Sequence, residues 1–229
     1  ENDLEDMVAS SDTGARKPLG VPGKLLVSIA AVWSLFQLWI ASPLPYIVGF
    51  GVFSATEARS IHLAFALFLA FMAYPAFKRS PRDRVPLADW ALAAVAAFCG
   101  AYLFIFYADL AQRPGLPITQ DIIVGVVGIL MLLEATRRAL GPPLMIVAAV
   151  FIAYSLFGPY MPGILAHRGV SLGGLINHQW LGTQGVFGIA LGVSTSFVFL
   201  FVLFGALLDK AGAGNYFIKV AFSLLGHFK

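Results

Sequence analysis

Six long apolar stretches divide the chain, and short polar connections separate them. A helix needs about 20 mainly apolar residues to cross a bilayer, with a lower limit of about 17. The pattern therefore predicts an all-α polytopic membrane protein with six transmembrane helices. The six predicted spans lie at about residues 24–41, 61–77, 87–107, 119–140, 144–157 and 185–208.

Two shorter segments have the pattern of amphipathic helices that lie in the membrane interface. In residues 171–180, Leu172, Leu175 and Trp180 recur at helical spacing, which predicts a short outer helix with Trp180 at headgroup depth. Residues 215–228 would form a helix with a narrow polar stripe on one side and a broad apolar surface on the other. About 21 Å of helix is too short to cross, so this segment is expected along the inner interface.

The basic residues are sorted by side. If the N-terminus is inside and the gaps alternate, twelve Lys and Arg residues fall inside and three fall outside. Because basic residues near membrane helices tend to stay in the cytoplasm, this asymmetry predicts a cytoplasmic N-terminus. The three outside residues are Arg59, Arg113 and Arg168.

Composition agrees with a membrane protein and excludes other classes. The chain is 59% hydrophobic and 12% charged, with a mean hydropathy of +0.83. Soluble domains are about half apolar and a quarter charged. The pI of about 9.1 does not indicate nucleic-acid binding, because short inside loops carry most of the positive charge. Cys99 is the sole cysteine, which excludes an intrachain disulfide and a cysteine metal cluster.

Three parts are predicted along the sequence. Residues 1–23 are rich in Asp, Glu, Ser, Gly and Pro and lack the pattern of a secretory signal, so we expect a disordered cytoplasmic tail. Gly141-Pro142-Pro143 combines a helix stop with prolines suited to a new helix start. We place a domain boundary there, between a four-helix membrane domain at 24–140 and a second domain beginning at 141–229.

The charged residues of the spans are expected near the membrane surfaces. Asp89 and Asp109 are about 30 Å apart along the third span, the thickness of the hydrocarbon core, so each is expected to cap one end. Glu134 is followed at i+3 and i+4 by Arg137 and Arg138, and we expect ion pairs there.

The pattern gives no sign of catalysis or metal binding. No two histidines have a metal-ligand spacing, and no serine has a Gly-x-Ser-x-Gly context. The chain is therefore predicted not to be an enzyme and to hold no metal or organic cofactor, with a membrane enzyme as the weakest alternative. Small residues recur every four positions at Gly188, Gly192 and Ser196, a pattern typical of close helix packing.

From Gly141 onward, many short motifs follow one another in a fixed order. They are Gly-Pro-Pro-Leu-Met at 141–145, Tyr-Ser-Leu-Phe-Gly-Pro-Tyr-Met-Pro-Gly at 154–163, His-Arg-Gly at 167–169, Asn-His-Gln-Trp at 177–180, Gly-Thr-Gln-Gly at 182–185, Gly-Val-Ser-Thr-Ser at 192–196 and Asp-Lys-Ala-Gly at 209–212. Residues 134–229 closely resemble the start of the large membrane domain in fused TRAP (tripartite ATP-independent periplasmic) transporter permeases. Residues 1–133 resemble the fused small-subunit portion in layout alone.

This resemblance implies a multi-pass secondary transporter of the bacterial inner membrane. Permeases of this type import organic acids, usually with sodium as the coupling ion, and resemble partners of TAXI-type extracytoplasmic binding proteins. The re-entrant hairpins that hold substrate and ions are expected beyond Lys229, so no ligand is assigned to a residue here. The chain is expected to be an N-terminal part that anchors the moving domain.

The outside loops are expected to help dock the binding protein, with His167, Arg168 and Gln179 as candidate contacts. Sidedness alone motivates this assignment. The alternative is a stand-alone membrane scaffold or assembly subunit without transport activity, because the same helices suit either role. Lipid is the other expected partner, and nucleic acid is not expected.

Overall fold

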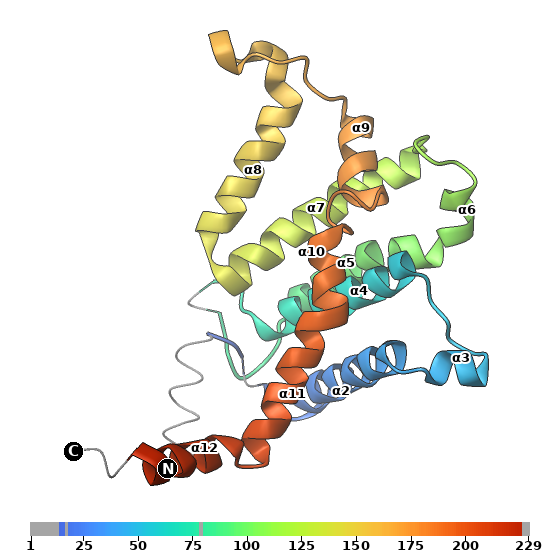
Figure 1. Ribbon diagram of the computed structural model, residues 1–229. Coiled ribbons are helices and arrows are strands. Elements are labelled where there is room, and N and C mark those ends of the chain that lie inside the picture. Colours follow the sequence, from blue (N-terminus) through green and yellow to red (C-terminus); the bar gives the residue numbers. More distant parts are fainter. Residues whose placement is uncertain (1–13, 17, 78–79, 226–229) are drawn as a thin grey trace.

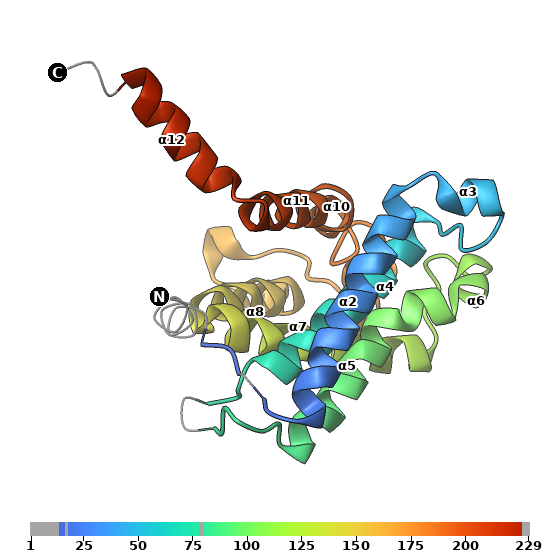
Figure 2. The ribbon, with the colours of Figure 1, turned by 90° about the horizontal axis from the view of Figure 1, so that it is seen from below.

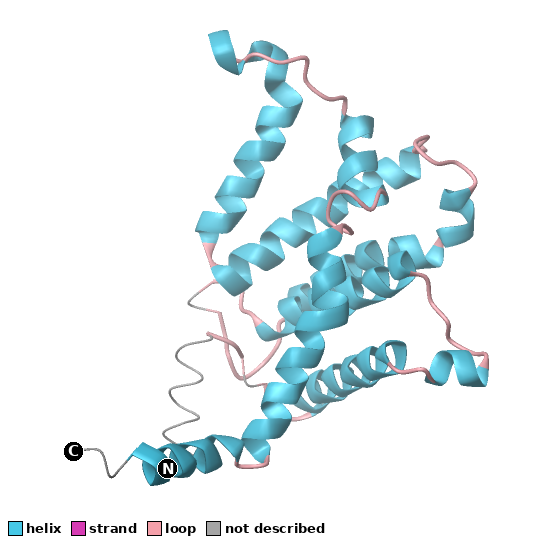
Figure 3. Ribbon diagram, viewed as in Figure 1, coloured by secondary structure: helices cyan, strands magenta, loops and turns pink. Residues whose placement is uncertain are grey.

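The structure is a computed structural model that describes residues 14–16, 18–77 and 80–225, and within these ranges it is helical and contains no strand (Figures 1 and 3). The first four long helices and their connections are α2 (Val21–Ala41), α3 (Leu44–Val48), α4 (Ala55–Ala73), α5 (Leu87–Ile105), α6 (Tyr107–Ala111) and α7 (Thr119–Leu140). After Gly141 follow α8 (Pro142–Phe157), η1 (Gly158–Tyr160), η2 (Gly163–Leu165), α9 (Leu172–Ile176), η3 (Asn177–Leu181), α10 (Ile189–Val193), η4 (Ser194–Val198), α11 (Phe199–Lys210) and α12 (Ala213–Leu225).

Five helices in the described ranges are long and apolar enough to cross a membrane, which confirms the predicted all-α membrane class. They are Val21–Ala41, Ala55–Ala73, Leu87–Ile105, Pro142–Tyr160 and Ile189–Lys210. The last of these is one continuous helix that contains the π-helical turn η4. Each lies on one of the predicted spans.

The fourth predicted span, α7, is not among these five. It is 22 residues long, about 33 Å of helix, which matches the hydrocarbon thickness. Its charged residues are Asp121 in the first turn, Glu134 less than two turns before the end, and Arg137 and Arg138 in the last turn. Its crossing of the membrane stays a prediction.

The segment predicted as an outer interfacial helix is helical, but the Trp180 side chain packs inside the protein instead of facing the membrane interface. α9 and the π-helical turn η3 cover Leu172–Leu181, and the Trp180 side chain is fully buried. Gly125 and Gly128 of α7 leave open the space that the side chains of Ile176 and Trp180 fill. Close packing against these glycines overrides the general tendency of tryptophan to lie at the interface.

Ordered structure begins inside the range expected for the N-terminal tail. Residues 1–13 and 17 lie outside the described part of the chain. Arg16 is buried against the helices, and α2 begins at Val21. At the other end, α12 runs from Ala213 to Leu225 and extends away from the bundle (Figure 2), while Phe228 of the predicted closing helix lies outside the described residues.

The closest helix pair is α4 with α5. Gly100 of α5 faces the backbone of Ala64, where a Cβ would be 3.0 Å from the Ala64 Cα. One turn away, the buried Ser60 hydroxyl donates to the Gly100 carbonyl at 2.7 Å and accepts from the Phe104 amide at 3.1 Å. A small residue and a satisfied hydroxyl thus bring the two backbones together.

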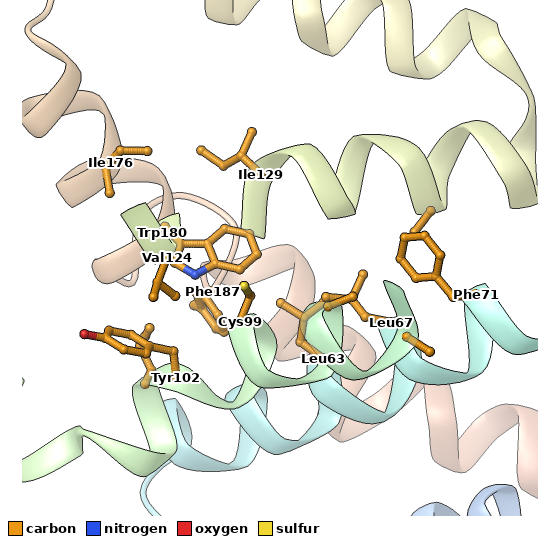
Figure 4. Close-up of a cluster of buried hydrophobic side chains, with 14 of the residues drawn as sticks. Leu63, Leu67, Phe71, Cys99, Tyr102, Val124, Ile129, Ile176, Trp180 and Phe187 are labelled. Atoms are coloured by element: carbon orange, nitrogen blue, oxygen red, sulfur yellow. The ribbon is translucent and has the colours of Figure 1, made fainter. Parts of the chain in front are cut away.

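The buried core continues past Gly141. Its residues include Leu63, Phe71, Cys99 and Tyr102 of the four-helix part and Ile176, Trp180 and Phe187 of the second part (Figure 4). By contrast, α8 has no buried residue and diverges from α7 after the turn at Gly141 (Figure 1). The two predicted domains therefore share one core through α9 and η3.

The ends of the helices meet in two groups, as alternating spans require. At one end the Arg16 amide donates to the Ala73 carbonyl and Leu19 to Asp83, so the N-terminal segment lies beside the connection between α4 and α5. At the other end, Arg113 in the connection from α6 meets Asp121 at the start of α7. We name these the inner and outer ends, following the predicted sidedness.

Candidate functional site

We define the joint as the contacts between residues 24–140 and residues 141–225, because any coupling between the two parts passes through them. Its centre is Trp180 on η3. The indole ring occupies the space beside Gly128 and meets the Phe187 ring edge-on, with centroids 5.5 Å apart. The Trp180 Nε1 is buried and has no hydrogen-bond partner among the described residues, so this contact depends on shape and apolar burial.

A polar cluster forms a second part of the joint, within the helical layer. The indole N–H of Trp33 and the side-chain amide of Gln37, both on α2, meet His62 Nδ1 on α4, the former at 3.2 Å. His62 Nε2 lies 3.2 Å from the Ser194 hydroxyl on η4. Since two N–H groups point at Nδ1, that nitrogen accepts, and the ring proton is assigned to Nε2, which donates to Ser194.

The outer end holds a buried carboxylate. Asp121 is fully buried and accepts from Arg113 Nη1 at 2.6 Å, from the Tyr102 hydroxyl at 2.6 Å and from the Ile118 amide at 2.9 Å. The last bond caps the first turn of α7. Three residues, one on α5 and two in the α6–α7 connection, therefore hold the start of α7 in place.

The inner end holds a larger charge network. Asp89 is buried and pairs with Arg16 at 2.6 Å and with Arg138 at 2.8 Å, and Arg138 also pairs with Glu134 at 2.7 Å. Arg137 Nη2 bonds to Glu134 at 2.7 Å and to the Ala76 carbonyl at 2.9 Å. The predicted pairing of Glu134 with Arg137 and Arg138 is confirmed. Asp89 lies in the first turn of α5 as expected, but it links three segments.

The three small residues predicted to pack helices have different surroundings. Gly188 precedes α10, and a Cβ there would lie 2.7 Å from the Gly185 carbonyl oxygen, so it serves a tight turn. Gly192 lies against the Arg59 guanidinium of α4. Ser196 is exposed, and its hydroxyl donates to its own helix at the Gly192 carbonyl. Gly192 alone of the three lies against another long helix, and it meets a side chain rather than a backbone.

The candidate docking residues are also separated. His167 Nε2 lies 2.9 Å from the Tyr154 carbonyl oxygen, and Nδ1 accepts from the Gly169 amide at 3.1 Å, so both ring nitrogens are used within the α8–α9 connection. Arg168 is exposed beside it. Gln179 is half-buried and lines a groove of about 260 Å³ between α7 and α8. Of the three, only Arg168 is exposed.

Comparison with known proteins assigns the second part of the chain. Residues 127–229 match the family model described as Tripartite ATP-independent periplasmic transporter, DctM component. We refer to residues 127–229 as the DctM segment because of this match. The match begins within α7, upstream of Gly141, so this helix spans the junction of the two parts. No curated protein and no solved structure matched the chain.

Several contacts that hold the helices together were not predicted from the sequence. Arg113 with Asp121 and Arg16 with Asp89 lie 8 and 73 positions apart, outside the i+3 and i+4 spacings that a helix makes visible. One sequence feature points to the insertion of Trp180: Gly125 and Gly128 lie on one face of α7 and leave space for a large side chain. The fit of Trp180 against Gly128, which holds η3 on α7, is therefore visible only in the folded chain.

Proposed function

We propose that this chain supplies the fixed scaffold of a TRAP-type secondary transporter in the bacterial inner membrane. The match of residues 127–229 to the DctM model supports a role as a TRAP transporter permease component. The observation that supports the scaffold role is the position of Trp180, which anchors the part of the chain after Gly141 in the core of the four-helix part. A segment fixed in this way moves together with α4, α5 and α7.

The substrate and the coupling ion follow from the resemblance. We propose organic acids as the substrates, sodium as the coupling ion and a TAXI-type binding protein as the partner outside the membrane. Within the described residues, no group of three or more His, Cys, Asp or Glu side chains is arranged to hold a metal ion. No residue here is assigned as a sodium or substrate ligand.

For the binding protein we propose docking at the outer end, on the α8–α9 connection. Arg168 is exposed there, and the neighbouring Tyr160 and Ile164 are 85% and 101% exposed. Aromatic and apolar side chains beside an arginine are typical of the energetic centre of a protein interface. His167 would then act by shaping this connection through its contacts with Tyr154 and Gly169.

Transport is tested with the permease expressed from its natural gene and reconstituted in proteoliposomes. Uptake of labelled organic acids is expected to require both the binding protein and an inward sodium gradient. Uptake without sodium would contradict the coupling ion. No uptake with the binding protein, the gradient and a panel of organic acids all present would favour a scaffold without transport.

Docking is tested separately by the concentration dependence on binding protein. Arg168→Ala is expected to raise the concentration needed for half-maximal uptake several-fold, while uptake at saturating binding protein is retained. His167→Ala is expected to have a similar but smaller effect, and Gln179→Ala is expected to have none. Arg82→Ala, on an exposed residue of the inner loop, is the matched control. An unchanged concentration dependence in Arg168→Ala would remove this docking surface.

A further inference from the structure

Arg59 is the one arginine within the described helices that pairs with no carboxylate of the described chain. Arg137 and Arg138 of α7 pair with Glu134 or Asp89, and Arg16 and Arg113, which pack against the helices, pair with Asp89 and Asp121. Arg59 donates one hydrogen bond, from Nη1 to the Phe187 carbonyl at 2.9 Å. A guanidinium has five N–H donors, so most of its capacity is open to a ligand.

The guanidinium lies in a groove between α2, α4 and the α10–α11 helix. Its volume is about 390 Å³, and its lining includes Ile40, Phe53, Ala58, Thr195, Ser196 and Leu200. Gly192 makes room for the charge, since a Cβ there would lie 2.6 Å from Arg59 Nη2. In Figure 1 the α10–α11 helix runs past α4 and α2, the two helices that close the other side of this groove.

Arg59 also lies at a definite depth. It is in the second turn of α4, about 6 Å along the axis from the outer end of the helix. A helix of 19 residues is about as long as the hydrocarbon core is thick, so a residue about 6 Å from its end lies just inside the core, where a long arginine side chain reaches the headgroups. A half-buried cation at this depth is costly without a counter-charge, and arginine prefers planar, bidentate contacts with phosphate or carboxylate groups.

The hydrogen-bond donors available in the groove favour an amphiphilic anion over a small soluble one. The Thr195 and Ser196 hydroxyls donate to the carbonyls of Leu191 and Gly192 in their own helix, at 2.7 and 2.8 Å. They therefore have no proton left to offer, and Arg59 is the main donor. A small soluble acid needs several donors to replace its water shell. An amphiphile needs one charged contact at the headgroup and an apolar wall for its chain.

We propose that Arg59 binds the phosphate of an outer-leaflet phospholipid, with one acyl chain lying along Ile40 and Leu200. The lipid bridges α2 and α4 of the four-helix part to the DctM segment and completes the joint at its outer edge. This site goes beyond the proposed transport function and does not depend on it.

The test measures lipid retention by native mass spectrometry. The protein is purified in a mild detergent and titrated with dioleoyl phosphatidylglycerol. Wild-type protein is expected to bind one lipid tightly. Arg59→Gln is expected to raise the dissociation constant for this lipid about tenfold or more, because a charge-assisted bidentate contact is lost. Arg59→Lys keeps the positive charge but loses the bidentate guanidinium contact, so its dissociation constant is expected to lie between those of the wild type and Arg59→Gln. Arg168→Gln, on an exposed outer arginine, is the matched control.

A second variant and a competition experiment test the site independently of Arg59→Gln. Ser196→Trp fills the groove from its exposed side and leaves Arg59 intact, so it is expected to lower lipid binding even if Arg59→Gln does not fold. Inorganic phosphate is added as a competitor and is expected not to displace the lipid at millimolar concentration. Equal lipid affinity in wild-type and Arg59→Gln would overturn the site. Displacement by inorganic phosphate would assign it to a soluble anion and overturn the lipid.

Discussion

Trp180 packs against Gly128 so closely that a Cβ at residue 128 would overlap the indole ring. Ile176 meets Gly125 in the same way one turn earlier on α7. These two pairs insert the α9–η3 segment into the four-helix part. Because the indole N–H has no partner, the stability of this contact depends on the fit of the ring and not on a hydrogen bond.

Gly128→Ala is therefore expected to destabilise the protein. The added methyl group meets a rigid ring that is fully buried, and overpacking of this kind costs about 1–3 kcal/mol in free energy of unfolding. The measurement is thermal or denaturant unfolding in detergent micelles, followed by far-ultraviolet circular dichroism. In a Trp180→Ala background the same substitution is expected to cost much less, because the ring it would strike is absent.

Gly205→Ala is the matched control for this prediction. Gly205 is also in a long helix, α11, but a Cβ there meets nothing within 4 Å. Alanine is expected to be neutral or to stabilise the helix by up to about 1 kcal/mol. Equal losses from both substitutions would show that the effect belongs to glycine in a membrane helix rather than to the contact with Trp180.

Asp121→Asn is expected to be among the most damaging single substitutions at the outer end. The carboxylate is fully buried and holds Arg113, Tyr102 and the start of α7. Removing one partner of a buried ion pair costs about 3–5 kcal/mol, because the remaining charge is left without compensation. Tyr102→Phe removes one hydrogen bond and is expected to cost about 1–2 kcal/mol.

Asp109→Asn is the control at the same end of the molecule. Asp109 is exposed on α6, and the described structure shows no ion pair for it. Its substitution is expected to change the free energy of unfolding by less than about 0.5 kcal/mol. A large loss there would indicate that any carboxylate at the outer end is important, against the specific role of Asp121.

The helices could be predicted because their signal is local. Apolar runs located the six predicted spans, and the i+3 and i+4 spacing revealed the pairing of Glu134 with Arg137 and Arg138. Both signals depend only on helix geometry. The family resemblance added the DctM segment, and it did so through short motifs rather than through physical pattern.

The joint could not be predicted because its partners are distant in sequence. Arg59 reaches the Phe187 carbonyl across 128 positions, and His62 reaches Ser194 across 132. The sequence around Trp180 does not predict its environment, because a tryptophan among apolar neighbours suits either the membrane interface or a protein core. The glycines that decide between these two environments lie on another helix.

Arg16→Gln is expected to loosen the N-terminal segment at the inner end. The Arg16 side chain is fully buried and bonds to Asp89 and to the Pro81 carbonyl. Asp89 keeps Arg138 as a second partner and is not left as an unpaired buried charge. The free energy of unfolding is therefore expected to fall by about 1–3 kcal/mol. Unfolding in micelles measures it. Arg138→Gln is expected to cost more, because Arg138 links both Asp89 and Glu134.

Arg82→Gln serves as the control for the inner network. Arg82 is exposed in the same connection and makes no ion pair in the described structure. An exposed charge of this kind contributes little to stability, so the substitution is expected to be close to neutral. A loss equal to that of Arg16→Gln would mean that the net charge of the loop, and not the buried pair, holds this end together.

The orientation of the chain is tested by cysteine labelling in intact cells. Cys99 is buried in the core, so the natural protein is expected to resist a membrane-impermeant maleimide. Pro114→Cys and Arg82→Cys place exposed thiols at the outer and inner ends. If the sorting of basic residues sets the topology, externally added label reacts at residue 114, and residue 82 reacts only after the cells are broken. The reverse pattern would place the Arg59 groove and the Arg168 loop in the cytoplasm. Both would then be out of reach of an outer-leaflet lipid and of an extracytoplasmic binding protein.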